Sequence, residues 1–275
     1  FYNMKALVFG HVCIDKNISE AKSYIAAGGP AVFINKTLNR FFCQTKVVAP
    51  YGKDFFSYSD NIPFYPKASA HNSALIYENI TKNNLRIQKA LNRTNDFNVK
   101  ITKRLIGELN QADIIFIAPL LPNIKPDYVR QINTAAKKDA LKVLLPQGYF
   151  RDFDQEDKVI IRKFFEANEI LPFIDIVVAS EQDHPQIKNL ARKWIKSDIT
   201  AVVITLGDKG ALIVSKNKEK HIPTIPVPLK EIVDSVGCGD VFSAGLAYYY
   251  KKSGDIKEAV DNANQLARSY LLGQS

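Results

Sequence analysis

Residues 232–245 read IVDSVGCGDVFSAG, in which we expect the end of an apolar strand, a glycine-rich turn and an amphipathic helix to follow one another. Gly237 and Gly239 allow the backbone to turn its N–H groups toward one point at the start of the helix. Such N–H groups and the positive end of the helix dipole together form an anion site. The stretch therefore indicates an anion site where a strand leads into a helix.

Asp240 lies in the first turn of this helix, and its carboxylate has two interpretations. It can cap the helix, or it can act as a general base on a hydroxyl that attacks a phosphoryl group held at the turn. The spacing favours neither of them. Cys238 also has two interpretations, because a thiol at a helix N-terminus can be reactive. The favoured one is a small buried residue.

Short β-branched runs alternate with longer helical patterns along the rest of the chain. The predicted strands are residues 5–10, 45–49, 113–118, 141–145, 174–179, 201–205 and 211–214. The predicted helices are residues 30–42, 125–139, 158–168, 183–197, 239–252 and 256–272. This alternation predicts a mainly parallel sheet with helices on both faces, which binds ligands beyond the carboxyl ends of its strands.

Residues 51–100 interrupt the alternation. Two extended runs, residues 73–80 and 85–91, flank a turn at residues 81–84, whereas residues 51–66 show no convincing helix. This pattern predicts a hairpin inserted into the α/β unit. Hairpins inserted over a ligand cleft often serve as lids.

The composition is that of a single folded domain over residues 1–275, with 46% hydrophobic residues and a formal charge of +9. This charge would attract nucleic acid, a membrane surface or a phosphorylated small molecule. The lysines are spread along the whole chain and form no basic stripe with aromatic residues between them. We therefore favour a lysine-rich solvated surface and expect no nucleic-acid partner. The clusters at residues 137–138, 216–220 and 251–252 are expected at helix ends and in loops.

The remaining composition bears on compartment and metal binding. No run approaches the roughly 20 apolar residues that span a bilayer, and the first apolar run is too short and polar for a secretory signal. We therefore expect no membrane partner. Three cysteines without CxxC spacing indicate a reducing compartment, here the cytoplasm. The four scattered histidines argue against a metal site built from His and Cys.

Two further glycine patterns lie next to predicted elements. Gly207 and Gly210 belong to TLGDKG at residues 205–210, where a tight turn between two strands is the plain interpretation. Gly28 and Gly29 precede a proline at a helix start, where a ligand can approach the backbone. The chain has no GxxxxGK[ST] motif and no GxGxxG after its first strand, which argues against a P-loop NTPase and a dinucleotide-binding protein.

Taken together, these motifs resemble those of the ribokinase-like (PfkB) carbohydrate kinases. DSVGCGD at residues 234–240 resembles the family signature DTxGAGD, and TLGDKG resembles its nucleotide segment TxGxxG. Residues 10–15 and the pair Gly28-Gly29 are similar to its substrate-side segments, and SEQD at residues 180–183 stands where the family has NxxE. The resemblance implies a three-layer α/β fold with a reduced β lid, from about residues 11–27 and 66–100.

The resemblance also implies an ATP-dependent phosphotransferase. Asp240 would deprotonate the acceptor hydroxyl, and the N–H groups of Gly237, Cys238 and Gly239 would stabilise the transferred phosphoryl group. The other implied residues are Asp15, Gly28 and Gly29 for the acceptor, and Ser180, Thr205, Gly207, Gly210 and Asn264 for ATP. Asp183 would hold Mg²⁺ through water. The loop that contains Asp234 holds a monovalent cation such as K⁺ in many relatives.

The acceptor side departs from the ribose-binding members of that family. Phe33 stands where they have Asn in GGxxxN, and their carboxylates near residues 120–122 are absent here. GxxCxD at residues 10–15 and QxxxRxFD at residues 147–154 look closer to the plant-type myo-inositol kinase branch. A cyclitol or related polyol is therefore the favoured acceptor, with Gln147 and Arg151 as candidate contacts. Their other interpretation is surface polar residues that follow a strand.

Two alternatives stay open. One is a nucleoside kinase, because adenosine and other nucleoside kinases share this fold. The other is a sugar- or nucleotide-binding protein on the same fold that no longer turns over. Only twelve residues separate Asp15 from Gly28, which leaves room for little of the first lid segment. A small lid buries little apolar surface between subunits, so a monomer and a weak homodimer are both expected states.

Overall fold

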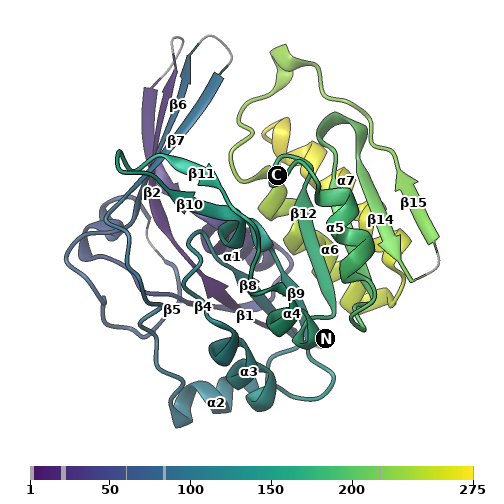
Figure 1. The fold of residues 1–275 in the computed structure, drawn as a ribbon, viewed down its shortest axis with the longest axis horizontal. Helices are drawn as coiled ribbons and strands as arrows, with labels where there is room; N and C mark the ends of the chain where they lie inside the picture. Colours follow the sequence, from purple (N-terminus) through teal and green to yellow (C-terminus); the bar gives the residue numbers. More distant parts are fainter. Residues whose placement is uncertain (1–2, 20–22, 60, 83–84, 217, 275) are drawn as a thin grey trace.

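The computed structural model describes residues 3–19, 23–59, 61–82, 85–216 and 218–274. Within these residues nine strands form one large sheet (Figure 1). From edge to edge they are β15 (Lys218–Ile222), β14 (Ala211–Ser215), β13 (Ala201–Thr205), β12 (Ile176–Ser180), β9 (Leu141–Leu144), β8 (Ile114–Ala118), β1 (Lys5–Gly10), β4 (Gln44–Val48) and β5 (Phe64–Tyr65). The strands from β13 to β5 are parallel, and only β14 and β15 are antiparallel additions.

Helices cover both faces of this sheet. One face packs on α1 (Pro30–Arg40), α6 (Cys238–Ser253) and α7 (Ile256–Leu271). The other packs on α2 (Lys103–Leu109), α3 (Pro126–Ala135), α4 (Ala167–Ile170) and α5 (Ile187–Trp194). Side chains alternate between the two faces of a strand, so Ala6 and Val8 of β1 lie in the first core and Leu7 and Phe9 in the second. The predicted three-layer fold is confirmed.

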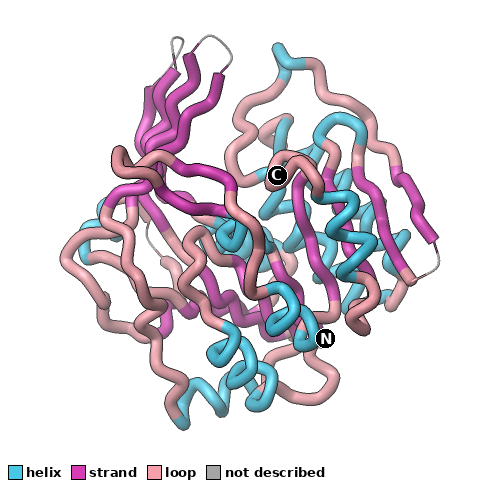
Figure 2. The backbone as a smooth tube through the Cα atoms, viewed as in Figure 1, coloured by secondary structure: helices cyan, strands magenta, loops and turns pink. Residues whose placement is uncertain are grey.

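A separate lid sheet adjoins the carboxyl end of β1. Its strands, in order, are β3 (Ser23–Gly28), β2 (Cys13–Ser19), β6 (Ile76–Lys82) and β7 (Leu85–Leu91). Figure 2 shows these strands as a group apart from those of the large sheet. The short stretch after Asp15 still supplies the β2–β3 hairpin, and β6 and β7 form the predicted second one. Residues 83–84 of the predicted turn lie outside the described residues.

The helix predicted at residues 158–168 is wrong. Val159–Ile161 form strand β11, which pairs with β10 (Arg151–Phe153), and only α4 is helical at the end of this stretch. Consecutive β-branched residues favour a strand that packs on its neighbours. The hairpin is joined to the lid, because the Ala90 N–H donates to the Asp157 carbonyl oxygen at 3.0 Å. This correction matters because the hairpin carries Arg151.

Three smaller predictions also differ from the structure. Residues 232–236 belong to no strand and form an irregular segment. Lysines of the cluster at residues 216–220 lie partly on β15, an edge strand, where lysine hinders pairing with a second sheet. Helix α2 was not predicted. Among the described residues, no helix has both the length and the apolar character needed to cross a membrane.

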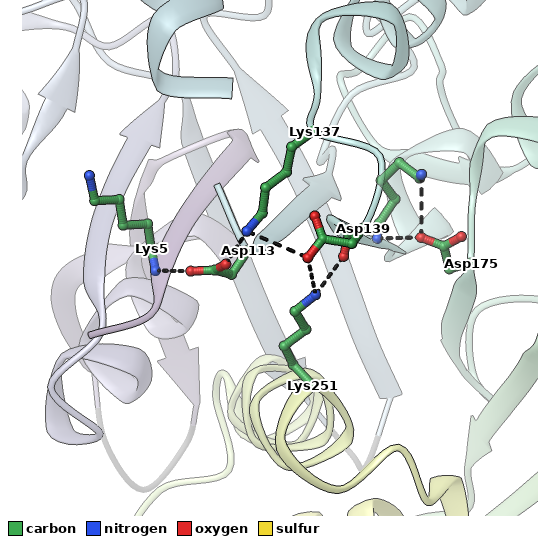
Figure 3. A network of polar contacts seen from close by, with 7 residues as sticks. Lys5, Asp113, Lys137, Asp139, Asp175 and Lys251 are labelled. Atoms are coloured by element: carbon green, nitrogen blue, oxygen red, sulfur yellow. Dashed lines mark hydrogen bonds and ion pairs between the residues drawn. The ribbon is translucent and has the colours of Figure 1, made fainter. Parts of the chain in front are cut away.

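A network of ion pairs and hydrogen bonds between charged side chains joins the amino-terminal ends of the strands (Figure 3). Asp113, which precedes β8, is 2% exposed and accepts a hydrogen bond from the Lys5 backbone N–H at 2.8 Å. Its carboxylate also pairs with the Lys137 ammonium at 2.5 Å. Lys137 and Lys251 each lie 3.7 Å from the Asp139 carboxylate. The network therefore connects the end of α6 to the starts of β8 and β9.

Replacing Asp113 with alanine is expected to lower the free energy of unfolding by about 2–3 kcal/mol, because a buried backbone N–H and an ammonium group lose a charged partner. Urea denaturation measures this loss. Asp127→Ala is the matched control, since Asp127 makes an exposed ion pair with Arg130 and its loss should cost under about 0.5 kcal/mol. Equal effects of the two substitutions would contradict a structural role for Asp113.

Candidate active site

The lid and the carboxyl ends of the parallel strands enclose a cleft of about 1170 Å³. That volume exceeds what one small ligand needs, since single-ligand pockets measure roughly 300–1,000 Å³. Every predicted site residue lines this cleft except Gly28 and Asp183. The residues come from the lid, from the loops after β9, β12 and β13, and from the start of α6, so the fold brings together segments far apart in the sequence.

The glycine turn before α6 faces this cleft. Gly237 has a left-handed backbone with φ 81°, and a Cβ atom there would lie 2.4 Å from the ring of Phe33. No atom lies within 4 Å of the position of a Cβ on Gly239, so the cleft side of the turn is open. Among the described residues, the N–H groups of Gly237 and Gly239 have no acceptor, whereas the Cys238 N–H donates to the Ser235 carbonyl oxygen at 3.2 Å. Two of the three predicted donors are therefore available to an anion.

Asp240 is half-buried and lines the cleft. Burial, and then the negative charge of Asp15, raises the pKa of its carboxyl to about 7; the charge of Arg151 acts to lower this pKa and that of Asp183 to raise it. Within the described part of the chain, the carboxylate accepts no hydrogen bond from the first turn of α6. The geometry therefore favours a chemical role for Asp240 over helix capping.

Cys238 is also half-buried. Burial, and then the charge of Asp240, raises the pKa of its thiol to about 11. Because the thiolate is the reactive form, this environment favours the interpretation as a small packed residue. Its sulfur lies 3.8 Å from the Ala267 carbonyl oxygen on α7.

The acceptor half of the cleft is built around Asp15 on β2. Asp15 is 7% exposed, and its Oδ1 accepts a hydrogen bond from the Cys13 thiol at 3.3 Å. Gly28, on the neighbouring strand β3, pairs with Cys13, and a Cβ on it would come 1.8 Å from the Asp15 Oδ2. Gly28 therefore makes room for this carboxylate rather than lining the cleft itself.

Arg151 is buried within the site, and its interpretation as a surface residue is wrong. It is 7% exposed, and its guanidinium lies 4.9 Å from the ring centroid of Tyr77 on the lid. Its Nη1 has no hydrogen-bond partner among the described residues. The charge of Arg151 acts to lower the pKa of both Asp183 and Asp240. A cation therefore lies between the lid and the carboxylates of Asp183 and Asp240. Gln147 lines the same part of the cleft and hydrogen-bonds to Asp183.

A row of polar side chains crosses the cleft face of the lid. Tyr24, Asn17, Asn79 and Gln88 occupy paired positions on the four strands, and all of them line the cleft. The Gln88 Nε2 donates to the Asn79 Oδ1 at 2.7 Å, and the Asn79 Nδ2 donates to the Asn17 Oδ1 at 3.1 Å. We did not predict these residues from the sequence. The alternation of polar residues along β2 could have indicated them, because Asp15, Asn17 and Ser19 lie on one face of that strand.

The donor half lies beyond β12 and β13. Gly207 and Gly210 both have positive φ values, 60° and 90°, and bound the turn after β13. A Cβ on Gly210 would come 2.2 Å from the Ile222 carbonyl oxygen, so this turn packs closely on β15. The outer wall of this half is apolar, with Ile225, Pro226, Val227, Ala267 and Leu271.

Three predicted donor-side residues have side chains that hydrogen-bond to backbone groups of the protein. The Thr205 hydroxyl donates to the Ala179 carbonyl oxygen at 3.4 Å, and the Ser180 hydroxyl accepts from the Gln182 N–H at 3.1 Å. Asn264 donates to the carbonyl oxygens of residues 222 and 223 at 3.3 and 3.4 Å. Its amide therefore holds the segment after β15 against α7.

The two candidate cation residues differ in their surroundings. The Asp183 carboxylate accepts from the Ser180 N–H at 2.8 Å, and burial raises its pKa. Asp234 has hydrogen bonds to both carboxylate oxygens, from the Val236 N–H at 2.9 Å and the Tyr24 hydroxyl at 3.0 Å. Within the described ranges, no group of three or more His, Cys, Asp or Glu side chains could hold a metal ion.

The comparison with protein families shows to which family this chain belongs. A model of the pfkB family carbohydrate kinases matches residues 18–271. The chain belongs to this family. The chain spans about half or less of the length of the curated relatives that it matches, which include a deoxyribokinase of Salmonella typhi. That enzyme is 31% identical over 140 residues, which are 50% of this chain and 44% of the enzyme. A cytidine kinase of Thermococcus kodakarensis is 30% identical over 109 residues, 38% of this chain and 39% of the relative.

Solved structures of ribokinase-family proteins share the fold of this pfkB family chain. A pyrophosphate-dependent kinase, complexed with a pyrophosphate analogue and myo-inositol, has a TM-score of 0.75 at 17% identity. That comparison covers 97% of this chain and 94% of the other. The ribokinase of Arabidopsis thaliana, complexed with ribose and ATP, has a TM-score of 0.70 at 16% identity, with 98% and 93% covered. These likenesses confirm the ribokinase-like fold.

Proposed function

We propose that this protein transfers the γ-phosphoryl group of ATP to a hydroxyl of a small polyol, with a cyclitol such as myo-inositol as the favoured acceptor. One observation carries the proposal: Asp240 lines the cleft that the acceptor-side and donor-side residues share, and it belongs to the same helix start as the available N–H groups of Gly237 and Gly239. Base and anion donors are thereby placed together.

In the proposed reaction Asp240 accepts the proton of the acceptor hydroxyl. The hydroxyl oxygen attacks the γ-phosphorus, and the bond from that phosphorus to the oxygen of the β-phosphate breaks, with its electron pair remaining on ADP. The N–H groups of Gly237 and Gly239 and the dipole of α6 stabilise negative charge on the transferred group. Binding of the acceptor beneath the lid excludes water from the attack.

Magnesium fits the charge balance of this site. The charges of Asp15 and Asp183 both act on Asp240, and the Arg151 guanidinium opposes them, so this part of the cleft has an excess of negative charge. Asp183 would hold the ion through water, since its carboxylate already accepts a backbone N–H. When bound, magnesium supplies neutralising charge to the phosphates of ATP. Asp234 remains a candidate ligand of a monovalent cation in this proposal, although both of its carboxylate oxygens already accept hydrogen bonds.

The acceptor half favours a polyhydroxylated ligand. Asp15, Asn17 and Gln88 offer carboxylate and amide groups to hydroxyls on several sides, and Arg151 adds an unpartnered N–H. The Phe33 ring packs against Gly237 and contacts Tyr270 edge-on, so this position offers no amide for a ribose. The similar structure of a pyrophosphate-dependent kinase complexed with myo-inositol supports the same class of acceptor.

The proposed base predicts how activity depends on pH. Asp240 must be ionised to accept a proton, and its pKa is raised to about 7. We therefore expect kcat/KM for the acceptor to level off above about pH 8 and to fall about tenfold per unit below pH 7. Initial rates between pH 5.5 and 9 measure this profile. A plateau that extends down to pH 5 would contradict the raised pKa of the base.

A donor and acceptor panel tests the proposed function. Mg-ATP and magnesium pyrophosphate are each supplied with myo-inositol, other polyols, ketoses, ribose, deoxyribose and nucleosides, and release of ADP or phosphate is measured. We expect release that depends on ATP and a polyol. Release that depends on nucleosides would instead support a nucleoside kinase. Ligand-induced stabilisation with no turnover would support the binding-protein alternative.

A further inference from the structure

We infer that Tyr24 is a positioning residue that connects the lid to the anion-binding turn. The inference rests on the proposed function. The Tyr24 hydroxyl donates a hydrogen bond to the Asp234 Oδ2 at 3.0 Å, across 210 residues of sequence. Tyr24 lies on β3 of the lid, and Asp234 begins the segment that leads into the turn at Gly237. No part of the proposed chemistry uses this contact.

On the side of the turn, Asp234 also hydrogen-bonds to the backbone of the segment that leads to Gly237. Its other oxygen, Oδ1, accepts from the Val236 N–H at 2.9 Å. The carbonyl oxygen of Val236 accepts from the Tyr270 hydroxyl of α7 at 2.6 Å. The peptide group before Val236 is thereby connected to the lid through Asp234, and the peptide group after Val236 is connected to the helix layer through Tyr270. The next residue, Gly237, presents an N–H group to the cleft.

On the lid side, Tyr24 continues the row of acceptor-facing residues. It pairs with Asn17 on β2, which accepts from Asn79 on β6. An acceptor that binds this row holds the same strands that hold Tyr24. The other end of β3 leads to Gly28, which makes room for Asp15. Burial and then the hydrogen bond to Asp234 raise the pKa of the Tyr24 hydroxyl to about 12, so it remains a donor at neutral pH.

This connection orders the anion-binding turn when the lid is down on an acceptor. A lid that lifts removes the Tyr24 hydroxyl from Asp234. Among the described residues, the segment before Gly237 then keeps its hydrogen bonds to α7, from the Tyr270 hydroxyl and from the Val233 N–H to the Leu271 carbonyl oxygen. Productive binding of the phosphoryl group is then tied to a closed lid, which an acceptor bound to the row of lid residues stabilises further. Transfer to water is correspondingly disfavoured.

The test compares wild type, Tyr24→Phe and Tyr65→Phe. Tyr65→Phe is the matched control, since its hydroxyl also bridges two elements, to Thr102 at 2.5 Å, but away from the cleft. Hydrogen–deuterium exchange of the ligand-free protein is measured at residues 234–238. We expect about tenfold faster exchange in Tyr24→Phe alone, as for the loss of a hydrogen bond to a charged group.

Kinetics with Mg-ATP and myo-inositol supply the second readout. In Tyr24→Phe we expect the ratio of phosphoryl transfer to ATP hydrolysis to fall about tenfold, with no change in Tyr65→Phe. Unchanged exchange at residues 234–238 in Tyr24→Phe would overturn the inference. If wild type shows no transfer to any acceptor, the proposed function fails, and the exchange measurement still decides whether Tyr24 holds the turn.

Discussion

Replacing Asp240 with asparagine is expected to lower kcat by about 10²–10⁴-fold, the range for loss of a general base. Asparagine keeps the size of the side chain but cannot accept the proton of the acceptor hydroxyl. Affinity for ATP should stay within a few-fold of wild type, because the N–H groups of Gly237 and Gly239 remain available. Steady-state kinetics and calorimetric titration with ATP measure the two effects separately.

The same substitution has a second expected effect, on stability. The pKa of Asp240 is about 7 in the folded protein, above its value of 3.8 in the unfolded chain. Ionising this carboxyl therefore costs folding free energy above about pH 4, and the neutral variant should melt at a higher temperature at pH 8. Asp261→Asn, at an exposed position on α7, is the control for both effects. An Asp240→Asn variant with near-wild-type turnover would remove Asp240 from the mechanism.

Replacing Gly237 with alanine is expected to lower kcat/KM by about 10²–10³-fold, as for loss of an anion-binding donor. The backbone φ of 81° disfavours any L-residue here, and the new Cβ would come 2.4 Å from the Phe33 ring. The turn must shift to relieve both, and the shift moves the N–H groups away from the phosphoryl group. Strain of this kind costs about 1–3 kcal/mol of folding free energy, so the variant should still fold.

Gly107→Ala is the matched control, since no atom lies within 4 Å of the new Cβ on α2. That change should keep activity and raise stability slightly, because alanine favours helices. Circular dichroism establishes that both variants fold, and steady-state kinetics then compares them. A Gly237→Ala enzyme within threefold of wild type in kcat/KM would show that the turn does not bind the transferred group.

Much of the fold could be predicted because its signals are local. The strand at residues 5–10 and the helix from residue 256 were predicted within one residue, since buried parallel strands are short apolar runs and the helix has a strong Asp255 cap. Likewise the turn at Gly237 could be found because positive φ requires a glycine. The spacing placed Asp240 in the first turn of the helix, whereas its role as a base was implied only by the resemblance to the PfkB kinases.

Other parts of the site depend on contacts that no local pattern encodes. Strand β11 was mistaken for the start of a helix, because its three apolar residues suit either structure. Only the packing of the β10–β11 hairpin against the lid buries Arg151 beside Asp240. Tyr24 lies 210 residues from its partner Asp234, so its contact exists only once the lid has folded over the cleft.

Phosphorus NMR of a reaction with Mg-ATP and myo-inositol, or with whichever polyol releases most ADP, tests the central claim most directly. The claim predicts that the γ-phosphate signal of ATP disappears while ADP and a phosphomonoester split by a carbinol proton appear in equal amounts. Asp240→Asn, run beside wild type, should give neither product on the same time scale. Inorganic phosphate as the only new product, or no change with any acceptor, would contradict phosphoryl transfer to a polyol hydroxyl.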